Sequence, residues 1–235
     1  MLDPSLDTVQ LASVFQIKSR IQIRNALLPE FAERLHYCLD EEVPWGVAYM
    51  GSDSNPRILT SENVSNFSGG DWAAINNEVL KNAVNGFQFL YNSYMMLNAY
   101  KEKRNPDLIL HRVLEYLNSE HFLAFVRAVT DCTDITRVDA QATRYIPGSF
   151  LKRHNDINQA GNRRIAYVLN LTRDWQVDWG GILQFLDNGG CIEETHFPSF
   201  NSLTLFQVPM WHNVSYVVPY ASSARYAITG WAMSS

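Results

Sequence analysis

The stretch Arg144-Tyr-Ile-Pro-Gly-Ser-Phe-Leu-Lys-Arg-His-Asn-Asp156 decides how the rest of this chain is interpreted. It places a histidine and an aspartate two residues apart, shortly after a Pro-Gly turn. In a β-strand, side chains at positions i and i+2 project from the same face, so His154 and Asp156 are expected to offer an imidazole nitrogen and a carboxylate oxygen to one ion. A helix would point them apart. The stretch therefore predicts a strand that carries two metal ligands.

A third ligand has to come from elsewhere in the chain. The best candidate is His212, which follows Pro209-Met-Trp at the start of a second β-like segment. Two histidines and one carboxylate on one face are the ligand set of non-haem Fe(II) sites, which leave coordination positions open for other molecules. A His-x-Asp triplet alone is common by chance, so the prediction depends on what the remaining sequence supports.

The composition indicates one globular domain with a sizeable core. The chain has 235 residues, of which 46% are hydrophobic and 12% aromatic. With a net charge of −5 and no long Lys/Arg run, the chain is not expected to have a basic surface for binding nucleic acid or an anionic membrane. Three scattered cysteines, Cys38, Cys132 and Cys191, favour a reducing cytoplasm over a disulfide framework. Neither a signal peptide nor a membrane span is expected, and the oligomeric state is not readable.

The first part of the chain, residues 1–134, is predicted to be mainly helical support. Pro29 suits the first turn of a helix, and Asp71 and Ser119 are expected N-caps. The expected elements are a strand over 15–23, a helix from Pro29 to the break at Pro44, a Gly/Ser/Asn-rich connection over 45–70, and helices over 71–95, 108–117 and 119–129.

The second part, residues 135–235, is predicted to be a jelly-roll core that holds the metal site. Short β-like runs separated by turns follow one another, without the βαβ alternation of a parallel sheet. The predicted strands cover 136–145, 150–155, 164–171, 182–186, 191–196, 202–208, 212–218 and 225–231. The expected fold class is therefore α+β with a mainly β core, a jelly roll buttressed by N-terminal helices.

Two of these strands predict an internal pocket. In the strand 164–171 one face is bulky and the other is small, so the small face is expected to leave room inside the barrel, with Asn170 aimed into it. In the strand 225–231, Arg225 shares a face with Ala227 and Thr229. A buried arginine needs an anion, which is either a protein carboxylate or a dicarboxylate cosubstrate held in two parallel hydrogen bonds.

Taken in order, five pieces of the region from about Arg137 to Trp231 resemble the Fe(II)/2-oxoglutarate-dependent prolyl hydroxylases, especially the EGL-nine and ribosomal-protein types. The family's fold is a double-stranded β-helix, in agreement with the strand count. The matching pieces are Tyr145-x-x-Gly148 with His154-x-Asp156, Arg163-Arg-Ile-Ala-Tyr-Val-Leu-Asn170, Trp179-Gly-Gly-Ile-Leu183, the isolated His212, and Arg225-Tyr-Ala-Ile-Thr-Gly-Trp231.

The resemblance implies a role for each matching site residue. His154, Asp156 and His212 would hold the iron, Arg225 would bind the distal carboxylate of 2-oxoglutarate, and Tyr145 would lie beside that cosubstrate. Asn170 stands where the family often has a tyrosine that assists the same carboxylate, and its amide can donate a hydrogen bond. The implied cofactors are Fe(II), 2-oxoglutarate and O₂, with ascorbate as a candidate reductant.

The resemblance also implies a dioxygenase that hydroxylates a prolyl residue in a peptide or protein and releases succinate and CO₂. The stretches 51–70 and 188–190 are expected to form rims that border the substrate. Hydroxylation of a free amino acid or another metabolite shares every ligand and stays open. A non-catalytic metal-binding barrel is a further alternative. A zinc hydrolase is weaker, since the His-Glu-x-x-His pattern is absent.

Overall fold

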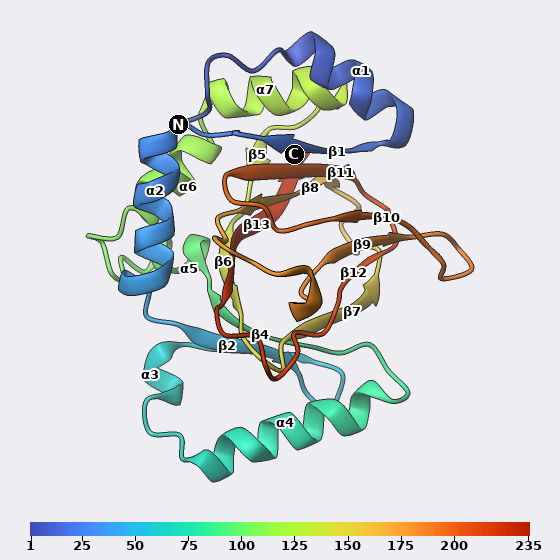
Figure 1. Ribbon diagram of the computed structural model, residues 1–235. Coiled ribbons are helices and arrows are strands. Elements are labelled where there is room, and N and C mark those ends of the chain that lie inside the picture. Colours follow the sequence, from blue (N-terminus) through green and yellow to red (C-terminus); the bar gives the residue numbers. More distant parts are fainter.

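A computed structural model describes all residues, 1–235, and shows one antiparallel sheet curled into a nearly closed barrel (Figure 1). The hydrogen-bonded order is β1-β11-β8-β13-β6-β4-β7-β12-β9-β10, with β2, β3 and β5 attached at its sides. The strands are β1 Arg20–Arg24, β2 Gly46–Met50, β3 Pro56–Leu59, β4 Phe89–Tyr94, β5 Arg137–Val138, β6 Gln141–Tyr145, β7 Phe150–His154, β8 Arg163–Asn170, β9 Leu183–Leu186, β10 Ile192–His196, β11 Ser202–Gln207, β12 His212–Val214 and β13 Arg225–Met233. The predicted β core is confirmed.

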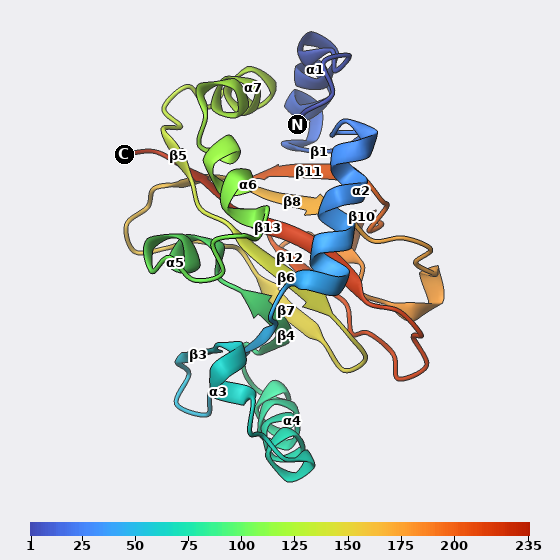
Figure 2. The same cartoon turned by 90° about the vertical axis from the view of Figure 1, so that its left-hand side faces the viewer.

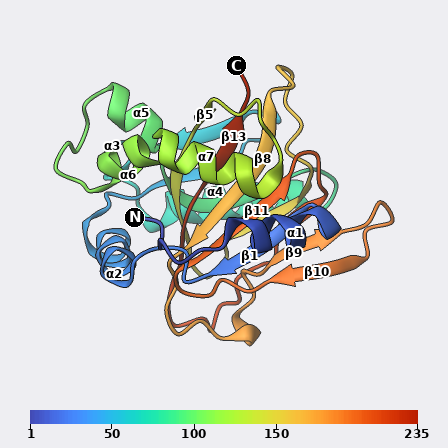
Figure 3. The same cartoon turned by 90° about the horizontal axis from the view of Figure 1, so that it is seen from above.

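Seven α-helices surround this barrel, and all of them precede β5 in the chain. In Figures 1 and 2, α1 and α7 lie on one side of the barrel and α4 lies on the opposite side, and Figure 3 shows α1 beside β1. None has the length and apolar character that crossing a membrane requires. The helices are α1 Thr8–Lys18, α2 Pro29–Tyr37, α3 Ser61–Val64, α4 Gly69–Ala83, α5 Met96–Lys101, α6 Leu110–Leu117 and α7 Glu120–Thr130, with a π-helical turn Cys38–Glu42 and a 3₁₀ turn Val177–Trp179.

Strand β8 separates two apolar cores. Its bulky face, with Ile165, Tyr167 and Leu169, packs into the larger core beneath the helices. Its small face, with Ala166 and Val168, belongs to a second core inside the barrel. Side chains alternate between the faces of a strand, so one sequence serves both layers. The predicted asymmetry of this strand is confirmed.

The strand expected over 15–23 is wrong in its first half. Helix α1 runs to Lys18 because Asp7 caps its start, accepting hydrogen bonds from the backbone N–H groups of the next turn. Ser19 ends it in a left-handed conformation, with φ of 54°, and β1 begins at Arg20. The alternating pattern over 15–18 is short enough to fit either structure.

The long helix expected over 71–95 is also wrong. Helix α4 begins after Ser68, which exchanges capping hydrogen bonds with Asp71, and it ends at Ala83. Residues 89–94 are instead β4, which pairs with β2, β6 and β7. Non-local pairing with three strands outweighs the helical spacing of the apolar residues. The preceding connection, 45–70, is more regular than expected, since it contains β2, β3 and α3.

Candidate metal centre and cosubstrate pocket

His154 and Asp156 face each other, although the strand that was expected to align them ends at His154. Asp156 lies beyond β7 with φ of 62°, a left-handed conformation that short polar residues tolerate. The guanidinium of Arg163 donates a hydrogen bond of 3.1 Å to the carbonyl of Asp156 and so fixes this turn. The two side chains meet as predicted, but the predicted geometry is wrong, because a turn and not a strand face aims the carboxylate.

His212 completes the cluster from the first residue of β12, opposite His154 on β7 and Phe185 on β9. Nε2 of His154 lies 3.1 Å from Oδ1 of Asp156, and Nε2 of His212 lies 3.5 Å from Oδ2. Each Nδ1 is within hydrogen-bond distance of a backbone carbonyl, that of Lys152 at 2.9 Å and that of Met210 at 2.8 Å. With Nδ1 donating, each ring presents the lone pair of Nε2 to the same point, which is the arrangement of metal-binding histidines.

The charge states of this cluster suit a cation. Burial alone would raise the pKa of Asp156, but the hydrogen bond with His154 and the neighbouring His212 outweigh it and lower the pKa to about 2. Burial, with His154 alongside, lowers the pKa of His212 to about 4. At neutral pH the cluster therefore offers an ionised carboxylate and a neutral imidazole, the forms that bind metals. The potential ligand atoms of the three residues lie within 4.8 Å of one another.

Arg225 is the second charged feature of the site. It begins β13, opposite Tyr145 on β6, and only 3% of it is exposed. Its Nη2 donates a hydrogen bond of 3.4 Å to Asn170, whereas Nε and Nη1 have no partner. Burial lowers the pKa of Arg225, yet an arginine does not lose its proton in proteins. A buried guanidinium with unmatched donors and no carboxylate partner fits a site for an anionic cosubstrate.

Asn170 supports this arginine from behind. Its side-chain amide lies 3.4 Å from the hydroxyl of Ser202, so the residue bridges Ser202 and Arg225. It is not among the residues that line the cavity described below. Asn170 therefore contacts Arg225, and its contact with a cosubstrate stays a prediction.

Tyr145 and Tyr91 form an aromatic wall next to Arg225. Their rings stack with centroids 5.1 Å apart, and the guanidinium carbon of Arg225 lies 5.1 Å from the Tyr145 centroid. Burial raises the pKa of both hydroxyls, to about 12 for Tyr91. The sequence prediction missed Tyr91 because it assigned this stretch to a helix. The aromatic residues Phe89 and Tyr91, two positions apart, were the signal for a strand.

One cavity of about 460 Å³ connects the metal cluster with this wall. It is lined by His154, Asp156 and His212 together with Tyr145 and Arg225. A separate open groove of about 630 Å³ lies between the β2–β3 turn and the α4–β4 connection. Met50 and Phe87 line both, so the groove adjoins the cavity. The turn 188–190 lines neither of them.

The sequence model of the 2OG-Fe(II) oxygenase superfamily matches residues 140–233, the segment from β6 to β13 that carries the cluster and Arg225. The segment that holds the candidate site is thus similar to that superfamily. The matched segment holds all six residues that the sequence singled out, and the superfamily's name specifies both Fe(II) and 2-oxoglutarate.

The chain is similar in sequence to one prolyl hydroxylase and in fold to others. A prolyl 3-hydroxylase of Mus musculus, OGFOD1, is 29% identical over 138 residues, which are 56% of this chain but only 24% of that protein. The structure of a Pseudomonas putida prolyl-4-hydroxylase superposes with a TM-score of 0.57 at 15% identity, covering 97% of this chain and 98% of the other. A Trichoplax adhaerens prolyl hydroxylase, solved with a hypoxia inducible factor peptide fragment, gives a TM-score of 0.54 at 16% identity, covering 97% and 89%. These two structures share the fold of this chain.

Proposed function

We propose that this protein is an Fe(II)- and 2-oxoglutarate-dependent dioxygenase that hydroxylates a prolyl residue in a peptide or protein. The observation that carries the proposal is a single cavity that holds both a His-Asp-His cluster and a buried arginine with unpaired donors. The unpaired Arg225 argues against a non-catalytic barrel, because an unpaired buried guanidinium lowers the stability of the protein.

In this proposal, His154, Asp156 and His212 hold the iron, and Arg225 grips the distal carboxylate of 2-oxoglutarate through its free N–H groups. When bound, Fe(II) would promote the reaction of O₂ with 2-oxoglutarate and the prolyl substrate, which yields succinate, CO₂ and the hydroxylated product. The stacked rings of Tyr91 and Tyr145 exclude water beside Arg225, which strengthens its attraction for the anion. Asn170 orients the guanidinium from behind.

The groove beside the cavity favours a polypeptide substrate. A free amino acid fits within the cavity, whereas an extended chain needs a surface on both sides of the reacting residue. The groove wall is fixed in place, because Nζ of Lys152 donates hydrogen bonds of 2.6 Å to the carbonyls of both Ala83 and Gly86 at the end of α4. Lys152 lies on β7 two residues before His154, so the groove and the metal cluster share one strand. The prolyl hydroxylases among the relatives support proline as the target.

The test is succinate release from protein loaded anaerobically with Fe(II) and 2-oxoglutarate. Proline-containing peptides and free proline are compared, and mass spectrometry locates a gain of one oxygen. Turnover of peptides with oxygen on proline supports the proposal. Efficient turnover of free proline or another metabolite, with none of any peptide, would replace it by a small-molecule oxygenase.

A matched pair of variants tests the role of the groove. Asn85→Trp places a bulky side chain in the groove, and Asn188→Trp places the same side chain on the exposed β9–β10 turn. We expect the first to raise the KM for peptide at least about tenfold and the second to leave it unchanged. The slow decay of 2-oxoglutarate without substrate should be equal in both. Equal peptide kinetics in both variants would remove the groove from the substrate path.

A further inference from the structure

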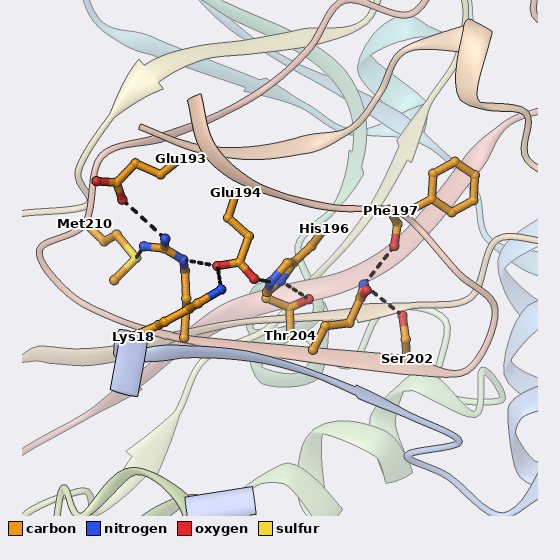
Figure 4. A network of polar contacts seen from close by, with 10 residues as sticks. Lys18, Glu193, Glu194, His196, Phe197, Ser202, Thr204 and Met210 are labelled. Carbon is orange, nitrogen blue, oxygen red and sulfur yellow. Dashed lines mark hydrogen bonds and ion pairs between the residues drawn. The ribbon is translucent and has the colours of Figure 1, made fainter. Parts of the chain in front are cut away.

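The two ends of the sheet meet without backbone pairing. Strand β1 bonds only to β11 and strand β10 only to β9, and these are the first and last strands of the hydrogen-bonded order. Side chains join them instead, as Figure 4 shows. Nε of Arg20 lies 2.9 Å from a carboxylate oxygen of Glu194, which also lies 3.1 Å from Nζ of Lys18, and Nη2 of Arg20 lies 3.2 Å from Glu193. This ion-pair cluster closes the seam of the barrel.

Arg20 is the centre of the seam. Only 10% of its side chain is exposed, against 55% for Lys18. Besides the two carboxylates, its Nη1 lies 3.8 Å from the sulfur of Met210 (Figure 4), and its guanidinium carbon lies 5.0 Å from the ring centroid of Phe185. Arg20 therefore contacts β9, β10 and the segment ahead of β12, none of which is adjacent to β1 in the sheet.

Two of these contacts lead directly to His212. The carbonyl of Met210 accepts the hydrogen bond from Nδ1 of His212 that aims Nε2 at the cluster. Phe185 is the strand neighbour of His212, and its ring packs edge-on against Phe206, which in turn packs against the imidazole with centroids 4.7 Å apart. Between β12, which carries His212, and the free edge of the sheet lie only β9 and β10, so an anchor on β10 also limits the movement of His212.

We propose that Arg20 is a positioning residue for the metal ligand His212. It acts through its ion pairs with β10 and its contact with Met210 across the seam. This inference rests on the proposed metal centre. Groups that orient a ligand from outside typically alter metal affinity by about 10- to 100-fold when removed. Arg20 acts through a backbone carbonyl and a strand neighbour rather than by touching the imidazole. Its effect therefore belongs at the lower end, about tenfold.

The seam offers a variant that keeps the fold. Arg20→Met retains the length of the apolar stem, and it leaves Glu194 paired with Lys18 and Glu193 about half exposed. Two other contacts hold the end of β10 in Arg20→Met, one between Nδ1 of His196 and the hydroxyl of Thr204 on β11 at 3.2 Å and one across the seam from Gln22 on β1 to the carbonyl of Phe197 at 2.7 Å. Lys18→Met is the matched control, because it removes a charge from the same Glu194 without touching Met210 or Phe185.

The experiment is a titration of the metal-free full-length proteins with Co(II), followed by visible absorption, with circular dichroism and thermal unfolding of each variant. We expect the Kd for Co(II) to rise about tenfold in Arg20→Met and by less than twofold in Lys18→Met. The absorption band should also change shape in Arg20→Met only, because the ligand geometry relaxes. A purely structural role would lower the unfolding temperature without changing either property.

The inference is overturned if folded Arg20→Met binds Co(II) as the wild type does. Should Arg20→Met not fold, Glu194→Gln tests the inference instead. It weakens the ion pair between Arg20 and β10 but leaves the ion pair of Arg20 with Glu193. A threefold or larger rise in Kd then supports the inference, and an unchanged Kd overturns it. Failure of the wild type itself to bind Co(II) would refute the metal centre and the inference together, which separates that result from a failure of Arg20 alone.

Discussion

Replacing Arg225 with methionine should shift stability and cosubstrate affinity in opposite directions. Arg225 as a whole is 3% exposed, and its guanidinium has one hydrogen bond, of 3.4 Å, and leaves Nε and Nη1 unpaired. An unpaired buried charge carries a desolvation cost of several kcal/mol, offset in part by about 0.5–2 kcal/mol from the face of Tyr145. Without 2-oxoglutarate, Arg225→Met is therefore expected to be as stable as the wild type or more stable, by about 0–2 kcal/mol.

Cosubstrate binding should respond in the other direction. Truncating one partner of a buried, hydrogen-bonded charge pair costs about 2–5 kcal/mol, which corresponds to a rise in Kd of roughly 30-fold to several thousand-fold. Arg225→Lys should lie between the two proteins, because an ammonium keeps the charge but lacks the two-pronged contact.

Unfolding experiments can measure both effects on one protein. Urea unfolding of the metal-free protein gives the intrinsic stability, and unfolding in Mn(II) with and without 2-oxoglutarate gives the stabilisation by 2-oxoglutarate. At 100 times the wild-type Kd, bound ligand stabilises by about 2.7 kcal/mol, and a 30-fold weaker variant retains only about 0.9 kcal/mol. If Arg225→Met lost more than about 2 kcal/mol without ligand and kept the full stabilisation with it, Arg225 would be a structural residue and the assigned pocket would be wrong.

Four further outcomes are expected. His154→Ala and His212→Ala should abolish Co(II) binding while circular dichroism stays unchanged, and an intact Co(II) site in either variant would contradict the ligand assignment. Lys152→Met should release the end of α4 and raise the KM for peptide several-fold, with 2-oxoglutarate decay as the control that should not move. Gly230→Ala should destabilise the fold by about 1–3 kcal/mol in urea, because a Cβ there would lie 2.2 Å from the carbonyl oxygen of Asp139; a loss below about 0.5 kcal/mol would refute this. The pKa of His212 is about 4 in the folded protein against 6.5 for a free imidazole, so as the pH falls the unfolded chain is protonated before the folded one. The stability of the metal-free protein should therefore decrease as the pH is lowered from about 6.5 to 4, and a urea midpoint that stays constant over this range would contradict the prediction.

The sequence by itself determined the β core of the protein and predicted the His-Asp-His cluster that the fold brings together. Strands β6 to β13 follow the predicted order, because short alternating runs between turns leave little choice of structure. Arg225 was found because a charge among small residues on a barrel strand needs an anion, and the two faces of β8 were read from side-chain size alone. These features are local, so the chain records them residue by residue.

Tertiary structure decided what depends on distant partners. Residues 89–94 became β4 because three strands pair with them, which the local pattern of apolar residues does not reveal. Asp156 reaches the two histidines through a left-handed turn held by Arg163, and Tyr91 joins the cavity only once β4 is in place. Arg20 meets Glu194 across 174 residues of chain, where the barrel closes. Such contacts arise from strand pairing over long separations, and a pattern of neighbouring residues carries no record of them.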